Sequence, residues 1–192
     1  MSMFQRKIYG KLLEWKQESE GRTALLIEGA RRIGKSTVVE AFAKEVYKSY
    51  ILIDFSKASK EVRELFDDVS DLDYIFLRLQ LIYKTDLYER DSVIIFDEVQ
   101  LCPMARQAIK HLVKDQRYDY IETGSLISIK KNVKDILIPS EEHKIRVYPM
   151  DYEEFIWATG GNANVLAMAY KSNMELGNAA NRNAMKDFRI YM

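Results

Sequence analysis

The chain has 192 residues, of which 47% are hydrophobic and 30% are charged, and its 29 Lys and Arg balance its 29 Asp and Glu to a formal net charge of zero. This composition excludes collagen, long low-complexity disorder and a small disulfide-rich protein, and the charge balance argues against a uniformly basic nucleic-acid-binding protein. Cys102 is the only cysteine and no segment reaches the roughly 18 consecutive apolar residues of a membrane span, so we expect a cytoplasmic protein without a membrane partner.

Hydrophobic patterns along the chain predict an alternation of helices and strands. Runs rich in Ile, Val, Leu and Phe without polar alternation are typical of strands covered on both faces, whereas apolar residues spaced three and four apart indicate helices. In chain order, the predicted elements are a helix at 6–18, a strand at 24–27, a helix at 35–47, a strand at 51–53, a helix at 72–83, a strand at 93–96, a helix at 104–114, strands at 118–123 and 144–148, and helices at 165–171 and 179–191. This order predicts a doubly wound α/β fold.

The composition changes after Gly160 and Gly161, where the chain becomes rich in Ala, Asn and Met and loses its strand pattern. We therefore expect two parts, a core at 1–158 and a helical, lid-like segment at 159–192. The sequence stops at Ile190-Tyr191-Met192 without a helix cap or polar tail, which suggests a cut within a longer protein.

Residues 29–36, with the sequence GARRIGKS, match the phosphate-loop pattern G-x-x-x-x-G-K-[ST] between a predicted strand and a predicted helix. Glycines let successive backbone N–H groups turn toward a phosphate, and the helix N-terminus adds its positive dipole. The Lys would contact the β- and γ-phosphates and the Ser would bind Mg²⁺. The predicted nucleotide-binding residues are Gly29, Ala30, Arg31, Arg32, Ile33, Gly34, Lys35, Ser36 and Thr37. For Arg31 and Arg32, a solvated surface position without a ligand is an equal alternative to phosphate binding. For Thr37, a packing role is an equal alternative to binding of the α-phosphate.

Two carboxylates follow the most apolar predicted strand. Asp97 would hold Mg²⁺ through water, and Glu98 would act as a general base that orients and deprotonates the attacking water. Thr123 ends the next predicted strand and would contact the γ-phosphate or the water, although Thr-Gly-Ser is also an ordinary turn sequence. The predicted catalytic residues are thus Lys35, Glu98 and Thr123, and the predicted metal ligands are Ser36 and Asp97.

The segments GARRIGKS, IIFDEVQ, ETGS and YPMDYEEF occur in this order and together resemble the prokaryotic AAA-like P-loop ATPases of the ASCE division that carry a C-terminal domain of unknown function. The resemblance implies a three-layer α/β/α P-loop NTPase fold with a mostly parallel five-stranded sheet, followed by a C-terminal helical segment. It implies that the strand before Thr123 lies between the phosphate-loop strand and the Asp97 strand. It also implies ATP or ADP with Mg²⁺ as cofactors, Glu98 as catalytic glutamate and a chain that stops before the further domain.

Other residues carry weaker signals. His111 and His143 lie far apart and no Cys/His cluster accompanies them, so a zinc site is not expected. Arg146, Arg182 and Arg189 are candidates for a charge-stabilising arginine finger, with a plain surface role as the alternative. The basic run at 130–134 could contact nucleic acid, but a solvated loop is the default.

The sequence therefore predicts an ATPase that hydrolyses ATP to ADP and phosphate to drive a conformational change. The alternative is a nucleotide-gated switch that binds protein or DNA with negligible turnover, and a small-molecule kinase is a third and weaker hypothesis. Nucleotide is the expected partner. A protein partner or a homo-oligomer is compatible with the sequence, and nothing in it specifically supports nucleic-acid binding.

Overall fold

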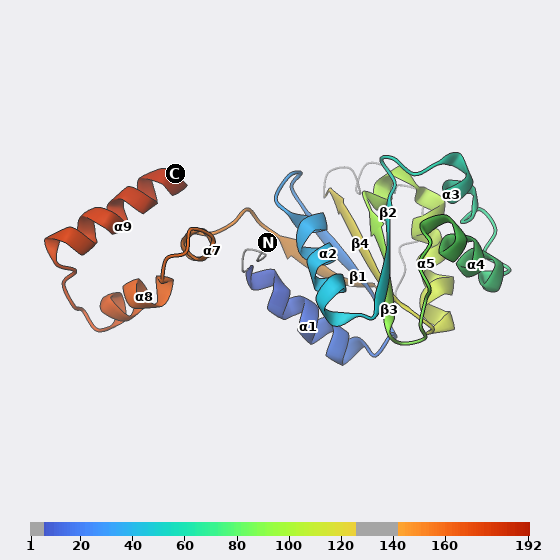
Figure 1. Cartoon of the computed structure of the whole chain (residues 1–192), viewed down its shortest axis with the longest axis horizontal. Coiled ribbons are helices and arrows are strands. Elements are labelled where there is room, and N and C mark those ends of the chain that lie inside the picture. The colour runs from blue at the N-terminus through green and yellow to red at the C-terminus, as the bar shows by residue number, and fades with distance from the viewer. Residues whose placement is uncertain (1–5, 126–141) are drawn as a thin grey trace. The chain divides into compact units, whose positions relative to one another are not determined.

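The computed structural model describes residues 6–125 and 142–192 (Figure 1). The chain divides into two compact units: Ile8–Tyr148, and Met1–Lys7 together with Pro149–Met192. Among the described residues, no helix is long and apolar enough to cross a membrane.

The first unit contains a five-stranded sheet in which every pair of neighbouring strands is parallel, and this confirms the predicted α/β fold. The strand order is β2-β3-β4-β1-β5. The strands are β1 (Ala24–Gly29), β2 (Ser49–Asp54), β3 (Ser92–Asp97), β4 (Asp119–Ser125) and β5 (Glu142–Val147). Because β4 lies between β1 and β3, as the resemblance implied, the carboxyl ends of these three strands meet at one edge of the sheet.

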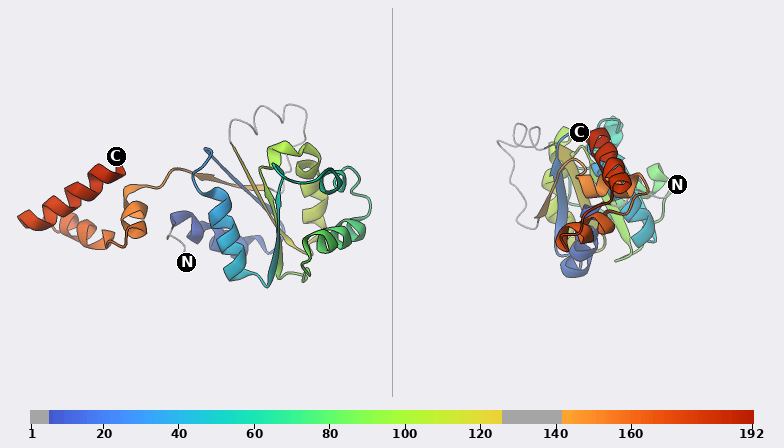
Figure 2. Two further views of the ribbon diagram at one scale, coloured as in Figure 1. Left: turned by 45° about the horizontal axis from the view of Figure 1, so that its top comes forward. Right: turned by 90° about the vertical axis from the view of Figure 1, so that its left-hand side faces the viewer.

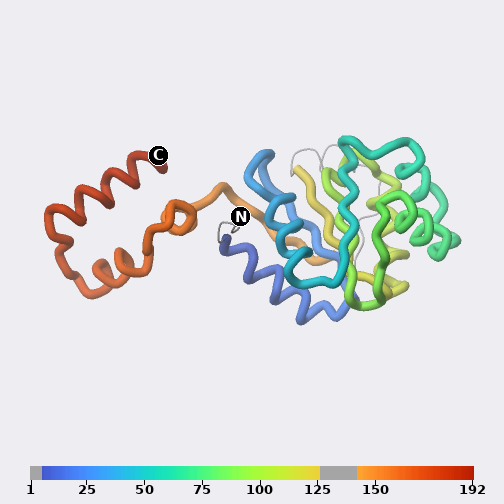
Figure 3. The backbone as a smooth tube through the Cα atoms, in the orientation of Figure 1, coloured from blue at the N-terminus to red at the C-terminus, as the bar shows by residue number. Residues whose placement is uncertain are grey.

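Helices cover both faces of this sheet (Figures 1 and 2). One face carries α1 (Lys7–Ser19) and α2 (Lys35–Val46), and the other carries α3 (Lys60–Glu64), α4 (Leu72–Tyr83) and α5 (Pro103–Asp115). The larger core lies between the sheet and α3–α5, where Phe55, Phe66 and Phe96 pack with ring centroids 5.3–6.0 Å apart. The 3-10 helix η1 (Val99–Leu101) follows β3, and α5 begins after one further residue, Cys102. The backbone tube in Figure 3 runs through these elements in chain order, from blue at the N-terminus to red at the C-terminus.

The second unit is helical, with α7 (Tyr152–Ala158), α8 (Ala163–Lys171) and α9 (Asn178–Tyr191). Asp151 and Glu154 form a capping box at the start of α7. Aromatic rings join α7 to α9, where the ring centroid of Tyr152 lies 5.3 Å from that of Phe188 and 5.6 Å from that of Tyr191. Aromatic contacts between α7 and α9 therefore help to hold this unit together, although α9 has no buried residue.

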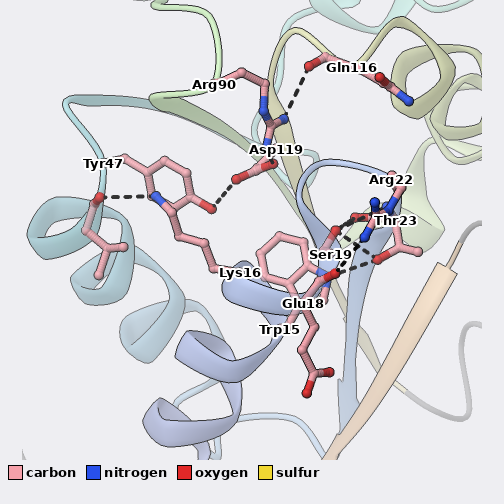
Figure 4. Close-up of polar contacts among 11 residues, drawn as sticks. Trp15, Lys16, Glu18, Ser19, Arg22, Thr23, Tyr47, Arg90, Gln116 and Asp119 are labelled. Atoms are coloured by element: carbon pink, nitrogen blue, oxygen red, sulfur yellow. Dashed lines mark hydrogen bonds and ion pairs between the residues drawn. The ribbon is translucent and has the colours of Figure 1, made fainter.

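A polar cluster at the amino-terminal end of the sheet joins α1, α2 and β4 (Figure 4). The Tyr47 hydroxyl donates to Asp119 at 2.7 Å, and Arg90 donates to the other oxygen of Asp119 at 2.9 Å. The Lys16 ammonium lies 3.5 Å from the centroid of the Tyr47 ring. Burial raises the pKa of Tyr47 well above its usual range, with the Asp119 charge adding to the effect, so Tyr47 remains a hydrogen-bond donor.

A second polar cluster is buried beneath α5. The Arg106 side chain is 1% exposed and donates to Glu122 on β4 at 2.8 Å and to Glu142 on β5 at 2.7 Å. The Lys144 ammonium lies 3.6 Å from the second oxygen of Glu142. Burial raises the pKa of Glu122 to about 8; Arg106 opposes this rise and Glu142 adds to it. Burial also raises the pKa of Glu142, so the Glu122–Glu142 pair holds a proton in the folded protein more tightly than an unfolded glutamate does.

This proton makes stability depend on pH. An unfolded glutamate has a pKa of about 4.3, so between about pH 5 and pH 8 the folded state binds more protons than the unfolded state, and the free energy of unfolding falls as pH rises. The loss should approach about 1 kcal/mol per pH unit. We expect Glu122→Gln to flatten this dependence, measured by urea unfolding at a series of pH values. The exposed Glu89→Gln variant serves as control, and an unchanged slope in Glu122→Gln would contradict the assignment.

Candidate functional site

The phosphate-loop sequence forms the turn between β1 and α2. The strand ends at Gly29 and the helix begins at Lys35, with Gly34 as its N-cap at φ 85°. This angle is in the left-handed region that glycine adopts at low cost. A Cβ atom on Gly29 would lie 2.4 Å from the carbonyl oxygen of Val147, so the close approach of β5 requires glycine there. Both glycines of the motif are thus needed for the shape of the loop.

Lys35 lies beneath the loop and is 5% exposed. Its ammonium donates to the carbonyl oxygens of Ala30 at 2.7 Å and Gly29 at 3.3 Å. Burial lowers the pKa of Lys35, whereas the nearby Glu98 and Asp97 charges raise it and Arg31 lowers it further. The loop therefore places one desolvated cation near the two acidic residues at the end of β3, Asp97 and Glu98.

Ser36, Asp97 and Thr123 come together at the carboxyl edge of the sheet. The Ser36 hydroxyl donates to Asp97 Oδ1 at 2.7 Å, and the Thr123 hydroxyl donates to the same oxygen. The backbone N–H of Glu98 donates to Thr123 Oγ1 at 3.4 Å. Side chains from three separate sequence motifs thus form one hydrogen-bonded group.

This group has the chemistry of a magnesium site. Mg²⁺ prefers hard oxygen ligands and usually keeps several waters, so it binds to one or two protein oxygens together with substrate phosphates. The Ser36 hydroxyl and the Asp97 carboxylate supply such a pair at adjacent positions. Within 6–125 and 142–192, no group of three or more His, Cys, Asp or Glu side chains lies so that it could hold a metal ion.

The remaining loop residues are more exposed. Ala30, Arg31 and Arg32 have exposed side chains, and Ile33 is half-buried. Arg32 has a positive φ of 62°, so the loop makes a second left-handed turn before Gly34. Thr37 is exposed in the first turn of α2, which makes core packing the wrong alternative for this residue.

The three arginines considered as fingers differ in their surroundings. Arg146 on β5 pairs with Glu28 on β1 at 3.0 Å. Arg182 and Arg189 belong to α9, in the second unit. The basic run at 130–134 lies outside the described residues.

Two polar residues near the site have no counterpart among the predicted site residues. Asp54 ends β2 in register with Asp97, and hydrogen bonds from Ser56 and Lys57 outweigh burial and lower its pKa. Gln100 in η1 is 3% exposed and donates from Nε2 to the Glu98 carboxylate. A polar residue within the apolar sequence Val99-Gln100-Leu101 was the signal that could have identified Gln100.

Comparison with known protein families agrees with this geometry. A family model described as an AAA domain matches residues 21–156, which include the phosphate loop, Asp97, Glu98 and Thr123. The chain belongs to this AAA domain family. No curated protein matches the chain in sequence.

Solved structures with a similar arrangement include three proteins of low sequence identity. Aeropyrum pernix Orc1, solved in complex with DNA, is 11% identical with a TM-score of 0.51, over 88% of this chain and 56% of that one. The Thermotoga maritima RuvB Holliday junction branch migration motor is 14% identical with a TM-score of 0.47, over 82% and 51%. C. elegans PCH-2 is 13% identical with a TM-score of 0.44, over 90% and 48%. The AAA domain chain thus spans about half the length of these proteins, and the likeness to Orc1 supports the fold.

Proposed function

We propose that this AAA domain is a magnesium-dependent ATPase that converts ATP to ADP and phosphate and uses the reaction to drive a conformational change. The observation that carries the proposal is the convergence of the Ser36 and Thr123 hydroxyls on one carboxylate oxygen of Asp97, next to the phosphate loop. A strand-to-helix turn without a nucleotide role would not need a hydroxyl, a carboxylate and a buried ammonium at one point. Membership of the AAA domain family also supports ATP as the nucleotide that this site binds.

Each residue has a separate part in the proposed reaction. The loop N–H groups and the Lys35 ammonium bind the β- and γ-phosphates. Ser36 and Asp97 would hold Mg²⁺, and the bound ion would supply positive charge that neutralises the same phosphates. Glu98 accepts a proton from the attacking water, whose oxygen bonds to the γ-phosphorus while the bond from that phosphorus to the β–γ bridging oxygen breaks and ADP leaves. Thr123 contacts Asp97 and the Glu98 backbone, so it can link the metal side of the site to the base.

The Ser36→Ala variant tests this proposal. Loss of the hydroxyl removes one metal ligand, and we expect at least a ~10-fold fall in phosphate release at limiting Mg²⁺ with a smaller effect at high Mg²⁺. The measurement is phosphate release against Mg²⁺ concentration for wild type, Ser36→Ala and the exposed control Ser172→Ala.

Two results would count against the proposal. An unchanged Mg²⁺ dependence in Ser36→Ala would remove Ser36 from the metal site. A wild-type protein that binds ATP but releases less than one phosphate per chain in a single-turnover experiment would favour the nucleotide-gated switch instead.

A further inference from the structure

The chain makes a sharp turn immediately after β3. Glu98 has a φ of 53°, in the left-handed region, and its carbonyl oxygen accepts from the Leu101 N–H at 2.9 Å. Within this turn the Gln100 side chain points back toward Glu98, and its amide nitrogen donates to Glu98 Oε2. Gln100 is buried and Glu98 is half-buried, so this contact is partly shielded from water. The orientation of the Glu98 carboxylate is thus tied to a residue two positions further along the chain.

The turn is fixed from outside as well as from within. The Val99 side chain is buried in the core between the sheet and α3–α5. The Arg63 guanidinium on α3 donates to the carbonyl oxygen of Leu101 at 2.7 Å and to that of Ala58 at 3.3 Å, and it also donates to Phe55. Arg63 therefore joins the loop after β2 to the end of η1. Because the backbone around Gln100 is held on both sides, its amide has a defined position relative to Glu98.

We propose that Gln100 is a positioning residue, which binds Oε2 of Glu98 and thereby assigns Oε1 to proton transfer from the attacking water. The inference rests on the proposed role of Glu98 as general base. A hydrogen bond to a charged acceptor is stronger than one between neutral groups. The Gln100 amide is uncharged, so it orients the Glu98 carboxylate without forming an ion pair. An ion pair would make the carboxylate a weaker acceptor for the proton of the attacking water.

A purely structural role for Gln100 makes different predictions from a positioning role. If Gln100 only fills space, a residue of similar size and shape should replace it with little loss. If it acts through Glu98, loss of the amide should lower the rate of the chemical step, leave the affinity for ATP unchanged, and matter only while residue 98 can act as a base.

The test compares Gln100→Met, which keeps the length of the side chain but removes the donor, with Gln100→Glu, which keeps the shape and places a second carboxylate beside Glu98. We expect both to lower kcat by roughly 10- to 100-fold, with the larger loss in Gln100→Glu, and to change the Kd for ATP by less than about 2-fold. The exposed Gln107→Met variant on α5 is the matched control. Nucleotide affinity is measured by fluorescence titration, and folding of every variant is checked by urea unfolding.

A double-mutant cycle with Glu98→Gln gives the decisive readout. We expect Gln100→Met to cause no further loss of rate in the Glu98→Gln background. An equal fold-loss in both backgrounds, or a wild-type kcat in Gln100→Met, would overturn the inference while the ATPase proposal stands. A wild-type protein without turnover would instead remove the proposed function, and this inference with it.

Discussion

Replacing Glu98 by glutamine should lower the rate of ATP hydrolysis by about 10²–10⁴-fold, the range over which a positioned general base contributes to catalysis. Glutamine retains the length of the side chain and can still contact Gln100, but it cannot accept a proton from water. In the proposed site the loop and Lys35 bind ATP, so we expect the Kd for ATP in Glu98→Gln to remain within about 2-fold of wild type. Phosphate release and equilibrium binding, measured on the same preparations, separate the two effects.

The exposed Glu89→Gln variant makes the same chemical change away from the site and should hydrolyse ATP at the wild-type rate. Equal rates in wild type and Glu98→Gln would remove Glu98 from the reaction. A parallel loss of rate and affinity in Glu98→Gln would show that the residue contributes to binding rather than to proton transfer.

Local sequence patterns predicted most of the fold because each pattern reports the environment of its own segment. The helix at 72–83 agrees with α4 at both ends, since Asp71 caps its first turn and Lys84 ends it in the left-handed region. The predicted strands were placed correctly, but several predicted ranges end one or two residues before the observed strands do. In β2 and β3 the last residue is an aspartate, and a polar residue interrupts the apolar run from which the strand was predicted. Two short helices, α3 and α7, gave no clear helical pattern because they contain only one to two turns.

The candidate site could be predicted only in part. GARRIGKS and Phe96-Asp97-Glu98 carry their signals locally, so the loop and the acidic pair were identified before their meeting in space was known. That Thr123 shares an oxygen of Asp97 with Ser36 depends on β4 lying between β1 and β3. The family resemblance implied this order, but no local pattern carries it, because strand order is a property of the whole sheet. Gln100 was not predicted for another reason. Its side chain turns back toward Glu98 because Glu98 has a left-handed φ, which a glutamate rarely adopts.

Lys35→Ala should weaken ATP binding by ~100-fold or more. The ammonium is a buried cation beneath the phosphate loop, and charge-assisted contacts to phosphate oxygens are each worth about 1.5–3 kcal/mol. Alanine leaves the loop backbone able to bind phosphate through its N–H groups but removes the charge. Calorimetric titration with ATP and Mg²⁺ measures the loss, and the exposed Lys171→Ala variant should bind as wild type.

Lys35→Arg tests whether geometry matters in addition to charge. Arginine keeps the positive charge, but its planar guanidinium is larger than an ammonium and presents its donors in a fixed fork. The carbonyl oxygens of Gly29 and Ala30 accept hydrogen bonds from the ammonium of the buried Lys35, so a larger head group would have to displace them. We therefore expect Lys35→Arg to lose most of the affinity that Lys35→Ala loses. Retention of wild-type affinity in Lys35→Ala would contradict the assignment of this loop to phosphate, because no buried cation would then be needed to hold the triphosphate.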